Sequence, residues 1–257
     1  MTEQGRRFPE FYVTAPQPCP YISGRSERKI FTHLTPDKSA AMIDNLLRGG
    51  FRRSQNIAYM PYCDGCQACV SVRILVNEFK TSRSMRRIVK QNSDLEHQRV
   101  GAVATTEQYA LFRDYIGERH SDGGMADMSV LDYSMMVEDS AVETFITEYR
   151  RKSNSRLLSS AVTGDLPLAA AALCDHLSDG LSLAYSYFDP ELQDRSLGSY
   201  IILEHIEYAR TLGLPYVYLG YWIEESKKMS YKSRFLPQER LTRHGWTRID
   251  SETKNKK

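Results

Sequence analysis

The segment from residue 181 to residue 221 constrains the fold most, because it predicts a strand, a loop, a helix and a second strand in direct succession. Residues 181–188 have the apolar and aromatic pattern of a strand. A helix is predicted over about 197–212, where Gly213 can end it, and residues 216–221 form the next strand. Such an order places the loop before the helix at the end of a strand.

Two further strands are predicted before this segment, over 156–162 and 168–175, with hairpin-type turns TGDLP and HLSDG between the strands. An antiparallel meander that leads into strand, loop, helix and strand is typical of the GNAT acyltransferase fold. The chain is therefore expected to be of mixed α+β class, with antiparallel-rich sheets and flanking helices. Residues 107–119 predict another helix, and 142–151 are expected to form a helical connector.

The loop RSLGSY is the first candidate site, because a helix N-terminus offers backbone N–H groups and a favourable dipole to an anion. Arg195, Ser196, Leu197 and Gly198 form this loop, and Gly198 would let a ligand approach the backbone. Ordinary GNAT enzymes have Gly or Ala where this chain has Tyr200, which clears room for the coenzyme A pyrophosphate. Tyr200 is therefore expected to obstruct acyl-CoA. A tight turn without ligand is the alternative.

Four of the five cysteines, Cys19, Cys63, Cys66 and Cys69, lie in the first 70 residues. The run CDGCQAC has the spacing with which neighbouring thiolates hold zinc or an iron–sulfur cluster, and unmetallated structural or redox thiols are the alternative. An odd number of cysteines, and an N-terminus without the apolar run of a signal peptide, predict a reducing cytoplasm. No stretch is apolar enough for a membrane span.

The net charge is only +2, so any basic surface must be local. One basic run has its charges three or four residues apart, as on one stripe of a helix, which favours contact with a polyanion over a merely solvated face. Its residues are Arg83, Arg86, Arg87 and Lys90. A second run, 227–234, has the same two interpretations, and its cations could also receive an acidic side chain.

Eight segments, spread in order along the chain, resemble one family. They are CPY (19–21), GFRRS (50–54), CDGCQAC (63–69), SRSMRRI (82–88), RHSDGGM (119–125), YSYFDPELQDRSLGSY (185–200), LPYVYLGYWI (214–223) and KKMSYKSRF (227–235). The chain resembles the arginyltransferase family of aminoacyl-tRNA–protein transferases, in particular the bacterial aspartate/glutamate leucyltransferases. The resemblance implies two GNAT-like lobes packed together. Residues 1–105 would form the N-terminal lobe, with the cysteines and the first basic run, and 106–257 the transferase lobe with a short polar tail.

The resemblance also implies an activity: moving an amino acid from a charged tRNA to the α-amine of a protein that begins with Asp or Glu, which marks that protein for the N-end rule degradation pathway. The bacterial subfamily suggests leucyl-tRNA, and the broader family arginyl-tRNA. The aminoacyl ester is already activated, so neither a covalent nucleophile nor a cofactor is required. A monomer without a membrane partner is expected. The alternatives are an acyl-CoA-dependent GNAT enzyme and an RNA-binding metal or redox sensor.

Candidate residues follow from these patterns and from the resemblance. Asp189 could accept the proton of the amine or merely cap a turn, and alternate tyrosines of a strand divide between its two faces. The catalytic candidates are Asp189, Tyr187, His120 and Asp122. The candidates for binding the donor or its tRNA are Arg195, Ser196, Leu197, Gly198, Tyr200, Arg83, Arg86 and Arg87. The candidates for binding the acceptor are Tyr218, Tyr221, Lys228, Tyr231, Lys232 and Arg234.

Overall fold

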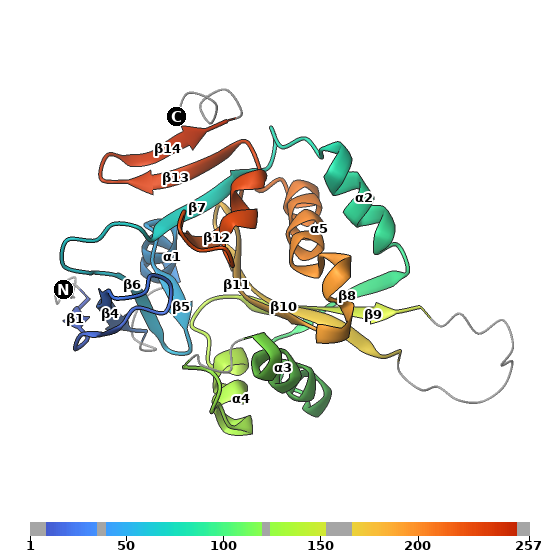
Figure 1. Cartoon of the computed structure of the whole chain (residues 1–257), viewed down its shortest axis with the longest axis horizontal. Coiled ribbons are helices and arrows are strands. Elements are labelled where there is room, and N and C mark those ends of the chain that lie inside the picture. The colour runs from blue at the N-terminus through green and yellow to red at the C-terminus, as the bar shows by residue number, and fades with distance from the viewer. Residues whose placement is uncertain (1–8, 35–39, 120–123, 153–165, 251–257) are drawn as a thin grey trace, which may run out of the picture.

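The computed structural model describes residues 9–34, 40–119, 124–152 and 166–250 (Figure 1). A four-stranded sheet with the order β1-β4-β6-β5 forms one end of the molecule. Its strands are β1 (Tyr12–Val13), β4 (Lys29–His33), β6 (Ile57–Pro61) and β5 (Arg52–Ser54). Helix α1 (Ala40–Arg48) packs on it through Ile43 and Leu47, and β2 (Gln17–Pro18) pairs with β3 (Ser26–Glu27) beside it.

The centre of the molecule is an eight-stranded sheet with the order β14-β13-β7-β12-β11-β10-β9-β8. In that order its strands are β14 (Gly245–Ile249), β13 (Gln238–Thr242), β7 (Val70–Leu75), β12 (Tyr216–Trp222), β11 (Gly180–Phe188), β10 (Leu168–Leu177), β9 (Thr144–Arg151) and β8 (Leu95–Gly101). Every neighbouring pair is antiparallel except β11 and β12. The expected mixed class with antiparallel-rich sheets is confirmed.

Helices cover both faces of the large sheet, and the side chains of β9 show how the faces divide. The ring of Tyr149 packs against Tyr200 of α5 (Leu197–Thr211), with 5.8 Å between the ring centroids. Glu148, on the other face, accepts a hydrogen bond of 2.8 Å from Gln108 of α3 (Thr106–Arg119). Helix α2 (Arg83–Gln91) backs α5, while α4 (Val130–Glu138) lies beside α3. The main hydrophobic core lies on both sides of this sheet.

Residues 142–151 were expected to be helical, and that prediction is wrong. The segment forms β9, which pairs with β8 on one side and β10 on the other. Residues 146–149 are all buried, so the strand lacks an exposed face and its pattern is not the usual alternation. Its β-branched and aromatic side chains suit a strand with neighbours on both sides and helices over both faces. The strand expected over 156–162 lies outside the described residues.

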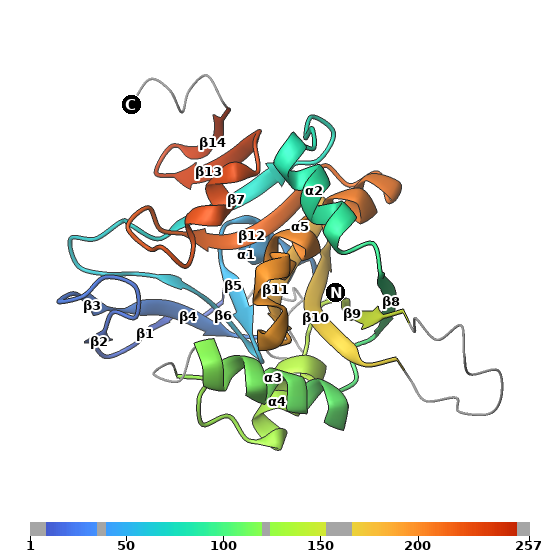
Figure 2. The same ribbon diagram turned by 45° about the vertical axis from the view of Figure 1, so that its right-hand side comes forward.

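Strand β7 comes from the first half of the chain but lies between two strands of the second half, β12 and β13 (Figure 2). Residues 70–101, which form β7, α2 and β8, thus belong to the unit built on the large sheet. The change from one sheet to the other falls between residues 61 and 70, and the expected boundary near residue 105 lies within the second unit. No helix among the described residues is long and apolar enough to cross a membrane.

Candidate active site between β11 and β12

The two parallel strands at the centre of the large sheet pair over a short stretch and then diverge. The pairs are Gly180 with Tyr216, Leu181 with Val217 and Ser182 with Tyr218. Beyond them β12 has a register irregularity between residues 218 and 220, and Gly220 has a φ of +68°. Backbone carbonyl groups of both strands that a continuous ladder would satisfy therefore need other partners.

Arg52 of β5 supplies these partners from the four-stranded sheet. Its Nη2 donates to the carbonyl oxygen of Leu183 at 3.3 Å and also to that of Ala184, and its Nη1 donates to the carbonyl oxygen of Leu219 at 3.4 Å. A Cβ atom added at Gly220 would lie 1.4 Å from Nη1, so both the positive φ and the close guanidinium require glycine here. The position of Arg52 between the strands therefore depends on glycine at residue 220.

Lys232 enters the same gap from the 3₁₀ helix η2 (Ser230–Arg234). Its Nζ donates to the carbonyl oxygens of Leu219 at 2.9 Å and Tyr221 at 2.7 Å, and the residue is only 9% exposed. Burial and, after it, the positive charge of Arg52 lower the pKa of Lys232 to about 7. Two cations therefore share one carbonyl oxygen between the diverging strands.

Tyrosines surround this pair of cations. Burial raises the pKa of each of their hydroxyl groups, and the nearby charge of Arg52 opposes that rise in all four. They are Tyr21, Tyr185, Tyr221 and Tyr231. Two of them, Tyr221 and Tyr231, were expected to bind the acceptor, and the structure places both beside Lys232. Two cations among aromatic rings suit a small anionic group.

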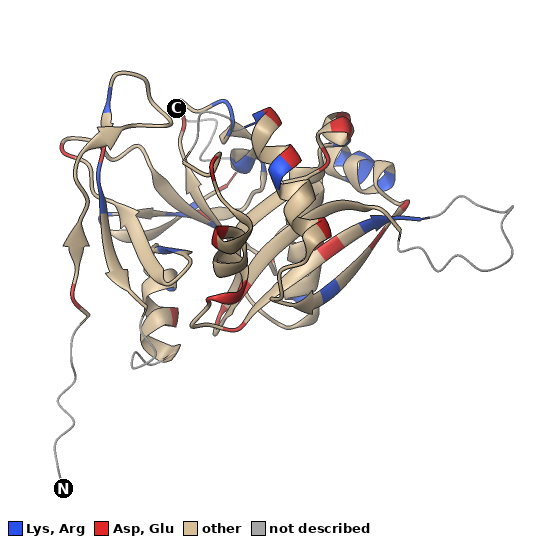
Figure 3. Ribbon diagram, turned by 90° about the horizontal axis from the view of Figure 1, so that it is seen from below, with Lys and Arg blue, Asp and Glu red and all other residues tan. Residues whose placement is uncertain are grey.

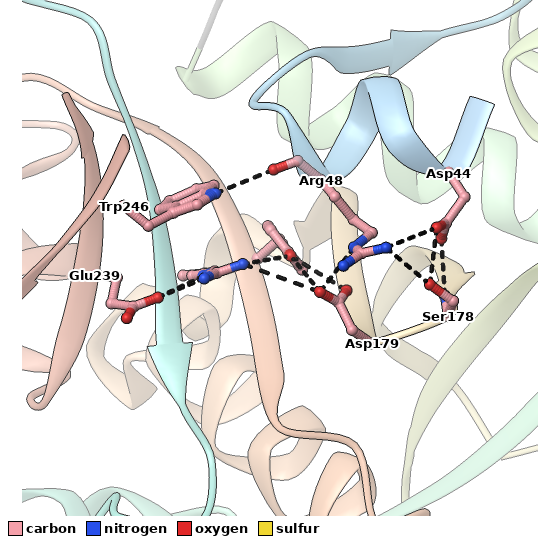
Figure 4. Close-up of polar contacts among 8 residues, drawn as sticks. Asp44, Arg48, Ser178, Asp179, Glu239 and Trp246 are labelled. Carbon is pink, nitrogen blue, oxygen red and sulfur yellow. Dashed lines mark hydrogen bonds and ion pairs between the residues drawn. The ribbon is translucent and has the colours of Figure 1, made fainter. Parts of the chain in front are cut away.

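Tyr218, the third tyrosine expected to bind the acceptor, lies apart from this group. Its hydroxyl accepts a hydrogen bond of 2.9 Å from Arg73 Nη1 and donates to Asp179 at 3.2 Å. Arg73 stacks on the rings of Tyr216 and Trp246, with 3.7 and 4.3 Å from Cζ to the ring centroids. Figure 4 shows this polar cluster, in which Arg48 of α1 also pairs with Asp179 at 2.8 Å. Its contacts join α1 to strands β7, β12 and β13 of the large sheet.

The loop before α5 is engaged with its neighbours. Arg195, at the end of the 3₁₀ helix η1 (Pro190–Arg195), pairs with Asp94 and donates to the carbonyl oxygen of Gln91 at 2.8 Å. The hydrogen bond from Arg195 lowers the pKa of Asp94. A Cβ added at Gly198 would meet Phe188 at 3.8 Å, an ordinary contact, so the space does not demand glycine. Ser196, at a φ of +55°, opens α5 without a side-chain cap.

Two residues expected to contact substrate at this loop are part of the core. Leu197 is 0% exposed and Tyr200 4% exposed, and Tyr200 packs on Tyr149. Burial raises the pKa of Tyr200 to about 12. The expectation that the Tyr200 ring obstructs a pyrophosphate at the loop is not supported by this position, because the core takes up the ring.

Among the catalytic candidates, Tyr187 is buried and its hydroxyl lies 2.5 Å from that of Tyr133. Asp189 accepts a hydrogen bond of 2.9 Å from the backbone N–H of Glu191 and lies 3.7 Å from Nη2 of Arg151. Turn capping, the alternative role of Asp189, is the contact that the structure shows. His120 and Asp122 lie outside the described residues. A catalytic role for any of the four stays a prediction.

The two basic runs, far apart in sequence, lie side by side. In α2 the charged residues are exposed while Met85 and Ile88 are buried, which makes one face basic (Figure 3). Arg234 of η2 donates to Ser84 at 3.4 Å, and Lys228 donates to the carbonyl oxygen of Arg119 at 3.1 Å. The basic surface, formed by Arg83, Arg86, Arg87, Lys90 and Arg234, therefore reaches the element that carries Lys232, while Lys228 contacts the end of α3 instead.

The four N-terminal cysteines line one cavity of about 70 Å³, together with Tyr21, Tyr59 and Tyr221. A backbone hydrogen bond from Ala68 and the guanidinium of Arg25, 3.2 Å from Sγ, lower the pKa of Cys66, against the effect of burial. Burial raises the pKa of Cys69 to about 12. The donor chemistry suits zinc or an iron–sulfur cluster, but within the described residues no three such side chains are arranged to hold an ion. Cys174, the fifth cysteine, is a buried core residue.

Arg52 is the site residue that the sequence did not single out. It lies in the run GFRRS, whose pattern gives no sign of which arginine reaches another sheet. The neighbouring Arg53 instead forms a buried ion pair with Asp175 at 2.7 Å. The signal that could have found it is Gly220, because a glycine inside an apolar aromatic strand marks a bulge or the close approach of another group.

Comparison with known proteins bears on both halves of the chain. The family model described as "Arginine-tRNA-protein transferase, N terminus" matches residues 17–87, and the one described as "Arginine-tRNA-protein transferase, C terminus" matches residues 107–242.

Relatives of almost the same length share more than half of the residues. An "Aspartate/glutamate leucyltransferase" of Xanthobacter autotrophicus is 58% identical over 250 residues, which cover 97% of this chain and 100% of the relative. A protein of the same description from a Bradyrhizobium species is 60% identical over 252 residues, 98% of this chain and 96% of the relative. The solved structure of FemX aligns with a TM-score of only 0.43 at 11% identity, over 75% of this chain and 62% of that one. On the family models and the two relatives together, the chain belongs to the arginine-tRNA-protein transferase family.

Proposed function

We propose that this protein transfers leucine from leucyl-tRNA to the α-amine of proteins whose first residue is Asp or Glu. The single observation that carries the proposal is the basic face of α2, which a hydrogen bond from Arg234 joins to η2, the element whose Lys232 lies with Arg52 between β11 and β12. The exposed face suits the phosphates of an acceptor stem. The choice of leucine, Asp and Glu rests on the description of the relatives.

The reaction is aminolysis of an ester. The neutral α-amine attacks the carbonyl carbon of the aminoacyl group, the bond from that carbon to the ribose oxygen of the tRNA breaks, and that oxygen takes up a proton. An α-amine has an unperturbed pKa near ~8, so part of it is neutral at pH 7. The protein has to align the two substrates, receive one proton from the ammonium and stabilise the transient oxyanion.

Asp189 remains a candidate for receiving the proton, although its contact with the backbone N–H of Glu191 caps a turn. The proposal has further parts. They are zinc or an iron–sulfur cluster on the N-terminal thiols, action as a monomer, a cytoplasmic location and entry of the products into the N-end rule pathway.

The test is a matrix of donors and acceptors. Labelled leucyl-tRNA and arginyl-tRNA are each incubated with the protein and with peptides that begin with Asp, Glu, Arg or Lys, and label on the peptide is measured. Label from leucyl-tRNA on the Asp and Glu peptides alone is the expected result. Label from arginyl-tRNA instead would change the donor, and peptide acylation that needs acetyl-CoA rather than tRNA would replace the proposal with the coenzyme A alternative.

A further inference from the structure

Arg52, which is half-buried, and Lys232, which is buried, have no carboxylate partner among the described residues, whereas three other buried or half-buried arginines do. Arg53 pairs with Asp175, Arg73 with Glu239 at 2.6 Å and Arg150 with Glu148 at 2.9 Å. The contacts of Arg52 and Lys232 are instead to the backbone carbonyl oxygens described above, and in the part of the chain that the structure describes neither forms an ion pair.

This arrangement leaves positive charge without a counter-charge between the two strands. Carbonyl oxygens carry only partial negative charge, and two cations that share the carbonyl oxygen of Leu219 repel one another where water screens little. Burial first, and then the charge of Arg52, lowers the pKa of Lys232. A bound anion would offset the repulsion between Arg52 and Lys232, because each cation would then have a counter-charge.

Both cations also keep donors for such an anion. An ammonium has three N–H groups, and Lys232 uses two of them on carbonyl oxygens. A guanidinium has five N–H groups, and Arg52 makes three hydrogen bonds. One carboxylate can accept from both residues at once, in the manner of a charge-assisted hydrogen bond.

We propose that Arg52 and Lys232 together bind the side-chain carboxylate of the acceptor's first residue, and so make the enzyme select Asp and Glu over Asn and Gln. This inference rests on the proposed transferase function. A small carboxylate fits the site better than a tRNA phosphate does, because Lys232 is buried and tyrosines lie near Arg52, while the basic surface of α2 offers exposed cations to phosphates. The close contact of Arg52 with Gly220 holds the guanidinium in this place.

The experiment compares leucine transfer by the full chain to four peptides that differ only in the first residue: Asp, Asn, Glu or Gln. Arg52→Gln should lower kcat/KM for the Asp and Glu peptides by at least about 30-fold and change that for the amide peptides little, because a charged group is left without its partner. Arg52→Lys should restore part of the preference. Arg243→Gln, which removes an exposed arginine from the turn between β13 and β14, is the matched control and should leave all four values unchanged.

Lys232→Met is the second variant. It removes the charge with an apolar side chain of similar length, so it should fold if Arg52→Gln does not, and it should lose the same preference. Equal loss for all four peptides, a rise in KM for leucyl-tRNA alone, or a wild-type protein without preference for acids would each overturn the inference. If wild type transfers leucine to no peptide, the proposed function fails. Calorimetric binding of the Asp and Asn peptides to wild type and Arg52→Gln then still tests the pair: loss of an Asp preference on substitution supports it, and equal binding overturns it.

Discussion

Tyr187 illustrates how a single buried hydroxyl finds its partner. Its hydroxyl shares a hydrogen bond with that of Tyr133, which in turn lies 3.4 Å from Oε1 of Gln108. Tyr187→Phe should therefore lower the free energy of unfolding by about 1 kcal/mol, the usual net value of one hydrogen bond. Urea denaturation measures this change. Transfer of leucine should stay within about threefold of wild type, since a neutral hydrogen bond in the core does not touch the reacting atoms. A large fall in kcat with unchanged stability would instead indicate that Tyr187 takes part in catalysis.

His205 of α5 gives a prediction on pH. The residue is 0% exposed and burial lowers its pKa to about 4, from 6.5 in the unfolded chain. Between these values the unfolded state binds the proton and the native state does not, so stability falls as the pH falls, by up to about 3 kcal/mol. His205→Gln should flatten the pH dependence of the free energy of unfolding over this range. Denaturation from pH 7 to pH 4 tests it, and His244→Gln on an exposed turn should keep the wild-type slope.

Single residues of the site could be predicted from sequence only where their neighbours are local. Lys232 and Tyr221 were proposed from runs of residues, and Lys232 donates a hydrogen bond to the carbonyl oxygen of Tyr221. Arg195 was proposed as a phosphate ligand, yet its charge is paired with Asp94, some hundred residues earlier. Whether a guanidinium is paired or available depends on contacts between distant strands, which no local pattern contains.

At the scale of elements, α2 is an amphipathic helix whose basic face the sequence predicted. Ser82 caps its first turn, and Met85 and Ile88 hold the opposite face against the core. The double change Arg83→Gln with Arg87→Gln should raise KM for leucyl-tRNA and leave KM for the peptide unchanged. It should also reduce the slope of log affinity against log salt, by about 0.7 to 0.9 for each tRNA phosphate that no longer meets a cation.

Arg243→Gln with Arg248→Gln, which removes two arginines from the β13–β14 hairpin, provides the comparison. If both double variants weaken tRNA binding equally, net charge accounts for the effect and α2 is not a specific contact. Filter binding at several salt concentrations distinguishes the two results.

Elements whose ends carry clear sequence signals, such as Gly213 after the helix, were predicted well. The helix expected over 197–212 is α5, Leu197–Thr211, and the strand expected over 216–221 is β12, Tyr216–Trp222. The segment 142–151 was assigned to the wrong type because it lacks the strict alternation of a half-buried strand. Its type follows from pairing with β8 and β10 and from helices on both faces, which are tertiary facts.

At the scale of the whole molecule, the buried ion pair of Arg53 and Asp175 joins β5 of the small sheet to β10 of the large one. Each side chain is 1% exposed, and Thr144 donates a further hydrogen bond of 2.7 Å to Asp175. Asp175→Asn should lower the free energy of unfolding by about 3 kcal/mol or more, because it leaves a buried guanidinium without its counter-charge.

The double variant Arg53→Met with Asp175→Leu should be less destabilised than the sum of its single changes. A double-mutant cycle by urea denaturation measures that difference. Additive losses would mean that the two charges act independently and do not hold the sheets together.

The place of β7 in the large sheet has a consequence for how the protein matures on the ribosome. The strand leaves the exit tunnel early, but its neighbours β12 and β13 are made more than 140 residues later. Until then both of its edges are open to pairing with other chains. The central sheet can be completed only when almost the whole chain has been synthesised. We therefore expect no partly made polypeptide to contain the complete site of Arg52 and Lys232 between β11 and β12.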